Sequence, residues 1–103
     1  MSDQDTINDV SVKNELKRPN MYAIYILNDD FTTFDFVIQV LRRIFNKSDE
    51  EANTIAKKVH NDGEAYVDTY TLEVAESKVY EVTALAQSQE FPLKLVLREV
   101  PTE

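Results

Sequence analysis

Two features of this sequence carry polar groups that could bind a ligand: the run Asn28-Asp29-Asp30 and a single histidine, His60. The run follows a stretch of apolar residues, so one amide and two carboxylates would emerge together from the end of one element. Such a cluster concentrates hydrogen-bond acceptors and negative charge. Short polar side chains also favour ordinary solvated turns, so the run alone names no ligand. It offers too few oxygen ligands for a calcium or magnesium site.

His60 lies one turn after Ala56, on the apolar side of a predicted helix. A neutral imidazole nitrogen can accept a hydrogen bond from a cation. A lone histidine at such a position is more often a partly buried side chain with a partner inside the protein, so both interpretations stay open. The sequence has no nucleophile motif near His60, its one glycine cannot form a phosphate-binding loop, and zinc would need further ligands. We therefore expect no enzyme, no metal site and no cofactor.

The apolar pattern predicts three strands and three helices that would position these groups. Ser48 and Glu51 form a capping box that opens the second helix, and Gly63 suits the left-handed residue after its end. Thr71 can cap the third helix. The expected strands are residues 22–27, 65–70 and 93–98, and the expected helices are residues 34–45, 48–62 and 72–89.

This order, β-α-α-β-α-β, predicts an α+β fold in which a small three-stranded antiparallel sheet packs against three helices. Residues 1–20 lack apolar periodicity and are expected to form a flexible N-terminal tail, with residues 21–103 as the folded core. The chain has 103 residues, of which 43% are hydrophobic, which is enough for one domain with a core.

The chain is acidic, with a formal net charge of -8 and a pI of about 4.6. It would repel a nucleic acid, whereas a cationic ligand is electrostatically favoured. There is no cysteine, no secretory signal and no apolar stretch long enough to cross a bilayer. We expect a cytoplasmic protein, a monomer, that binds neither nucleic acid nor membrane.

Several motifs, in this order, resemble the ClpS adaptor family. They are Leu27-Asn28-Asp29-Asp30-Phe31-Thr32, then Val59-His60 followed by Gly63, then Thr71-Leu-Glu-Val-Ala-Glu-Ser-Lys78, then Pro92-Leu93. Each motif is modest alone, but together at this spacing they are specific. The resemblance runs from about residue 19 to residue 99.

The resemblance implies a bacterial adaptor that binds N-degrons, which are proteins whose first residue is Leu, Phe, Tyr or Trp with a free α-amino group. It would deliver them to a ClpA-type AAA+ unfoldase for degradation by the Clp protease. By the family pattern, Asn28, Asp30 and His60 hold the α-ammonium. The side chain of the first residue would enter a pocket made by Thr32, Phe34, Val37, Ala56, Val59 and Leu93, although ordinary core positions would also be apolar.

Two departures from the family pattern matter. In the pocket, Phe34 and Ala56 stand where family members usually carry methionine. In the turn before it, Thr33 replaces the usual proline, which loosens that turn slightly. The resemblance also implies that Glu73 and Lys78 dock on the N-terminal domain of the unfoldase and that the tail is offered to it. Two alternatives remain at this point. One is an interaction module like the C-terminal domain of the ribosomal stalk protein; the other is a small hydrolase using Asp30 and His60.

Overall fold

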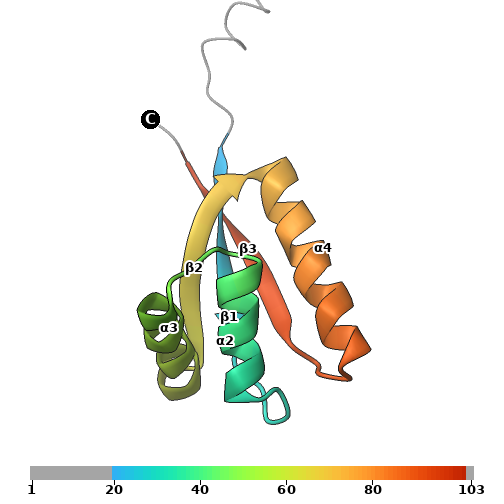
Figure 1. The fold of residues 1–103 in the computed structure, drawn as a ribbon. Helices are drawn as coiled ribbons and strands as arrows, with labels where there is room; N and C mark the ends of the chain where they lie inside the picture. The colour runs from blue at the N-terminus through green and yellow to red at the C-terminus, as the bar shows by residue number, and fades with distance from the viewer. Residues whose placement is uncertain (1–19, 102–103) are drawn as a thin grey trace, which may run out of the picture.

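The computed structural model describes residues 20–101, so the tail predicted for residues 1–20 lies outside the described residues except for Asn20. Figure 1 shows a sheet and three helices, and the predicted order of elements and the α+β class are confirmed. The elements are β1 (Met21–Leu27), α2 (Phe34–Arg43), α3 (Asp49–Asp62), β2 (Glu64–Thr71), α4 (Leu72–Ser88) and β3 (Lys94–Val100).

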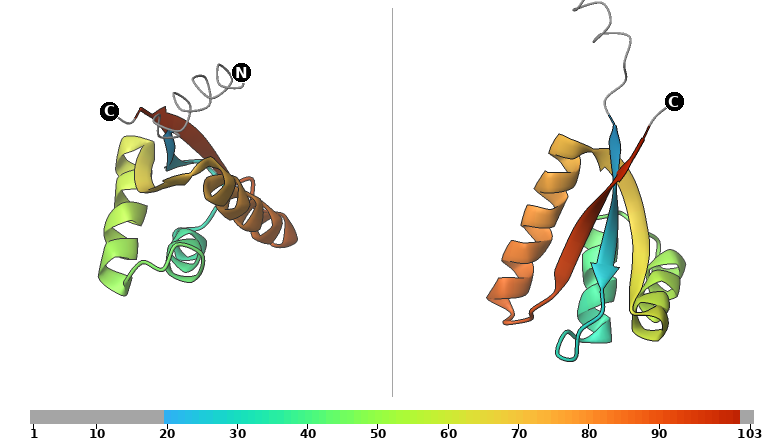
Figure 2. Two further views of the ribbon diagram at one scale, coloured as in Figure 1. Left: turned by 90° about the horizontal axis from the view of Figure 1, so that it is seen from above. Right: turned by 180° about the vertical axis from the view of Figure 1, so that it is seen from behind.

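The sheet has β1 at its centre, in the order β2-β1-β3, and both pairings are antiparallel. All three helices lie on one face of it (Figure 2). Ile24 and Ile26 of β1 are fully buried, because alternate residues of a strand point to the same face. On the other face, the Arg98 guanidinium lies 4.2 Å from the ring centre of Tyr25 and donates two 2.8 Å hydrogen bonds to the Glu64 carboxylate. These contacts join all three strands.

Side chains close the helix ends as the local sequence requires. Thr33 accepts a hydrogen bond from the Phe36 amide at the start of α2, and the Ser48–Glu51 capping box is formed at the start of α3. The predicted first helix is two residues too long: Ile44 is the C-cap, and Asn46 has a left-handed φ of 55° that a helix cannot continue through. Phe45 is nevertheless buried, which explains why its apolar character suggested helix.

β1 and α3 end next to each other. Asn28 comes directly after β1, and Gly63 directly after α3. The backbone N–H of Asn28 donates a hydrogen bond of 2.9 Å to the backbone carbonyl of Gly63. This junction places the polar turn after β1 against the last turn of α3. Between residues 20 and 101, no helix has both the length and the apolar character needed to cross a membrane.

Candidate ligand-binding site

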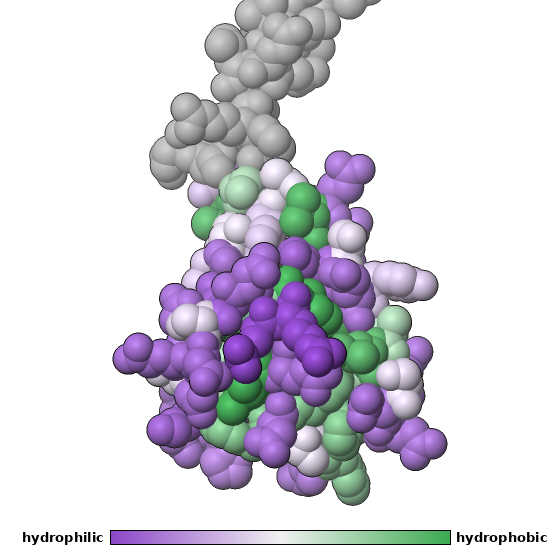
Figure 3. Space-filling model, in the orientation of Figure 1, coloured by the Kyte–Doolittle hydropathy of each residue, from purple (hydrophilic) through white to green (hydrophobic). Residues whose placement is uncertain are grey.

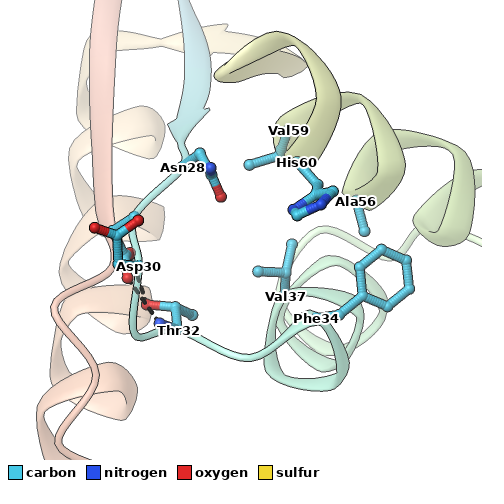
Figure 4. A pocket seen from close by; sticks show the side chains of 9 residues that line it. Asn28, Asp30, Thr32, Phe34, Val37, Ala56, Val59 and His60 are labelled. Atoms are coloured by element: carbon cyan, nitrogen blue, oxygen red, sulfur yellow. Dashed lines mark hydrogen bonds between the residues drawn. The ribbon is translucent and has the colours of Figure 1, made fainter.

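A hollow of about 330 Å³ opens where the end of β1, the loop after it, the start of α2 and the end of α3 meet (Figure 4). Polar groups form one part of its wall and apolar side chains the other. The residues that line this binding hollow are Asn28, Asp29, Asp30, Thr32, Phe34, Val37, Ala56, Val59 and His60. All the residues predicted for the amine site and the side-chain pocket are among them, except Leu93.

Asn28 and His60 project into the binding hollow from opposite walls (Figure 4). Their relative position follows from the backbone. Gly63 ends α3 with a φ of 90°. Its backbone N–H donates to the Val59 carbonyl at 3.0 Å, and its carbonyl accepts from the backbone N–H of Asn28. His60, in the last turn of α3, is therefore held opposite the residue that follows β1. An amide oxygen and an imidazole nitrogen facing one space can both accept from the same donor group.

Asp29 shapes the loop from inside. Its carboxylate accepts from the amides of Phe31 at 2.8 Å and Thr32 at 2.7 Å, and from the Thr32 hydroxyl at 2.7 Å. Partial burial raises the pKa of Asp29, but the hydrogen bonds from the Thr32 amide, the Thr32 hydroxyl and the Phe31 amide outweigh it, so the pKa is lowered overall. Asp29 was not among the residues predicted for the site, although an Asp two or three residues before free amides is a common turn signal.

Asp30 lies at the rim. Its carboxylate is turned to the outer side of the loop in Figure 4, away from the space that Asn28 and His60 face. The side chain is exposed, and it has no hydrogen-bond or ion-pair partner among residues 20–101. Nothing in the fold therefore holds it in this rotamer.

The apolar part of the wall is backed by the core. Val37, Ala56 and Val59 are buried, whereas the Phe34 ring is 40% exposed. The short Ala56 side chain leaves room that a longer one would fill. Leu93 belongs to the same buried core cluster but is not among the residues that line the binding hollow.

Glu73 and Lys78, predicted to contact an unfoldase, lie on α4. Glu73 is exposed in its first turn. Lys78 is half-buried: its Nζ donates to the Ile44 carbonyl at 2.8 Å and lies 5.9 Å from the ring centre of Tyr70. Lys78 thus ties α4 to the end of α2 and keeps its charge near the surface there.

The fold and the binding hollow define a small binding module, in which acceptors and an apolar cavity meet at one opening. Comparison of the chain with known proteins identifies the family to which it belongs. Residues 17–96 match the family model described as "ATP-dependent Clp protease adaptor protein ClpS". The chain belongs to the ClpS family, and it is an adaptor rather than an enzyme.

Individual relatives agree over most of the chain. The ClpS adapter protein of Helicobacter hepaticus is 38% identical, covering 90% of this chain and 94% of that protein. The one of Desulfatibacillum aliphaticivorans is 46% identical, covering 87% and 85%. Among solved structures, Agrobacterium tumefaciens ClpS2 bound to L-phenylalaninamide is 32% identical with a TM-score of 0.78, covering 81% of this chain and 100% of that one.

Proposed function

We propose that the binding hollow holds the free N-terminal residue of N-degron substrates beginning with Leu, Phe, Tyr or Trp, and that the protein delivers them to a ClpA-type unfoldase. The observation that carries this proposal is the placement of Asn28 and His60 on opposite walls of a cavity with an apolar floor. The Agrobacterium relative was solved with L-phenylalaninamide, which combines a free α-amine with an aromatic side chain.

The α-ammonium has three donors, and three acceptors suit it: the Asn28 amide oxygen, a neutral His60 nitrogen and the Asp30 carboxylate. Asp30 joins this set by changing its rotamer, a change that an exposed side chain makes within nanoseconds. Each charge-assisted hydrogen bond contributes about 1.5–3 kcal/mol. An internal residue offers one neutral donor and would leave acceptors without partners, so the site selects chain ends.

The first side chain of the substrate enters the apolar part of the hollow, between Val37, Ala56 and Val59. Burial of a Leu or Phe side chain contributes roughly 1.5–3 kcal/mol. Together with the ammonium contacts, and after the entropy of association is subtracted, we expect micromolar or tighter binding, about -8 kcal/mol. Phe34 stands at the mouth, so its ring is the surface that a bulky aromatic guest meets first.

Delivery uses the opposite end of the molecule. In Figure 1, α4 begins at the upper end, whereas the loop between β1 and α2 lies at the lower end. Glu73 and Lys78 on the first half of α4 make the contact with the N-terminal domain of the unfoldase, and the N-terminal tail is handed to it. A substrate in the binding hollow and an unfoldase on α4 can then be bound at once. The protein acts as a cytoplasmic monomer.

The test is a titration of peptides that differ only in their first residue. Leu-, Phe-, Tyr- and Trp-first peptides should bind at micromolar concentration or below, and Ser- or Lys-first peptides at least tenfold more weakly, because they bury little apolar surface. Equal affinity across the panel would refute the proposed pocket.

A further inference from the structure

A second hollow, open and about 620 Å³ in volume, lies along the side of α2, from its first turn to just beyond its C-terminal end. Eleven Lys and Arg residues occur in the whole chain, and three of them line this one hollow. Its lining residues are Asp35, Ile38, Gln39, Arg42, Arg43 and Lys47, and we refer to it as the α2-end hollow. The surface over α2 is strongly hydrophilic (Figure 3).

Part of this positive charge has a local explanation. Cations near the C-terminus of a helix are stabilised by its dipole, and Arg42 and Arg43 occupy the last turn of α2. Arg42 also pairs with Asp49 at 3.5 Å, and Lys47 pairs with Asp68 at 3.2 Å. These two cations therefore each have a carboxylate partner within the fold, although the Arg42–Asp49 pair is exposed to solvent.

Within residues 20–101, neither Arg43 nor Lys78 has a carboxylate partner. Lys78 reaches the same place from α4, since its Nζ donates to the carbonyl of Ile44, the residue that follows Arg43. That bond uses one of three ammonium donors. The carboxylate that lines the hollow, Asp35, is in the first turn of α2, at the other end of the helix.

We propose that the α2-end hollow receives an acidic segment of the Clp unfoldase and extends the contact made by Glu73 and Lys78. This inference rests on the proposed function. It commits to the unfoldase rather than to the substrate because Lys78, on α4, donates to the Ile44 carbonyl directly beside Arg43, so the proposed contact on α4 adjoins the hollow there. Carboxylates of the partner would meet Arg43 and the remaining donors of Lys78, and would compete with Asp49 for Arg42.

The direct test is Arg43→Glu, with Lys58→Glu as the matched control. Both cations are exposed, and within the described part of the chain neither forms an ion pair, so each change reverses one surface charge without removing an internal bond. Affinity is measured by calorimetry for the purified N-terminal domain of a ClpA-type unfoldase, and separately for a Leu-first peptide with a free amine.

Arg43→Glu should weaken unfoldase binding roughly tenfold and leave peptide binding within about twofold, while Lys58→Glu should leave both within about twofold. Arg43→Lys should retain binding, because it keeps the charge. Between roughly 50 and 200 mM salt, the wild-type affinity should fall more steeply than that of Arg43→Glu, since exposed charges are screened.

Equal weakening by Arg43→Glu and Lys58→Glu would overturn the inference, because it would show a response to net charge alone. A loss seen only with Leu-first peptides that carry acidic residues downstream would also overturn it and would assign the hollow to the substrate. Failure of the wild-type protein to bind any unfoldase domain would instead refute the proposed function itself, and this result is distinguishable from both.

Discussion

The backbone N–H of Asn28 donates a hydrogen bond of 2.9 Å to the backbone carbonyl of Gly63. This bond fixes the end of β1 to the end of α3, and two of the three proposed amine-binding groups lie directly beside it: Asn28 itself, and His60 three residues before Gly63. The geometry of the binding hollow therefore depends on one backbone junction, and the fold sets that junction before any ligand is present.

Gly63→Ala should destabilise the protein by about 1–2 kcal/mol, because Gly63 has a left-handed φ of 90° that residues with a Cβ adopt only at this cost. An added Cβ would meet no atom within 4 Å, so the penalty comes from the backbone and not from a clash. Gly63→Asn is the control, since Asn tolerates this conformation better and should lose less. Urea denaturation measures both. An equal loss for the two variants would contradict this explanation.

His60→Ala should weaken binding of a Leu-first peptide by roughly tenfold or more, because one acceptor of a charge-assisted hydrogen bond is removed. Stability should hardly change, as His60 is exposed. Asn61→Ala, an exposed neighbour outside the lining of the binding hollow, is the matched control and should bind normally. If both variants bound the peptide as the wild type does, His60 would have no part in the site.

Asp29→Asn should lower the free energy of unfolding by about 1–2 kcal/mol at pH 7, since a carboxylate accepts the three hydrogen bonds of the loop more strongly than an amide can. The pKa of Asp29 is lowered in the folded state. Its stabilising contribution is thus fully present above the unfolded pKa, near 4, and is lost as the pH falls through the folded pKa. The difference between wild type and variant should shrink below about pH 4. A difference that stays constant down to pH 2 would show that the charge of Asp29 does not matter.

Ala56→Met should shrink the binding hollow, because a long thioether would occupy space next to the short, buried Ala56 side chain. Trp- and Phe-first peptides should lose at least threefold more affinity than Leu-first peptides, since they need more volume. Phe34→Met, at the exposed mouth, should change the ranking less. Titration of each variant with the three peptides measures this. A uniform loss for all three would indicate general disruption instead.

Much of the fold was predictable because the sequence states it locally. The Ser48–Glu51 box and Gly63 mark both ends of α3, and the structure has both caps as predicted. The end of α2 was placed too late because apolar Phe45 continues the helical pattern, whereas Asn46 adopts a left-handed conformation that nothing in the sequence required. Tertiary burial, and not helix propensity, accounts for Phe45.

The site shows the same division. Eight of the residues predicted for it line the binding hollow, because strand and helix ends near Asn28 and His60 are well marked in the sequence. The burial of Leu93 in the core depends on how the elements pack, and no local pattern encodes it. The rotamer of the exposed Asp30 is set by no contact among residues 20–101, so it could not be predicted either. The bond from Lys78 to Ile44 spans 34 residues along the chain, so the link between α4 and the end of α2 could not be predicted from the local sequence either.

The central claim is that this protein grips a free α-ammonium beside an apolar hollow, and one pair of peptides tests it most directly. A Leu-first peptide and its N-acetylated twin differ in that charge and in two of its donors, and acetylation should weaken binding at least a hundredfold, given about 1.5–3 kcal/mol for each charge-assisted bond. Equal affinity for the two peptides, measured by calorimetry near pH 7, would contradict the account.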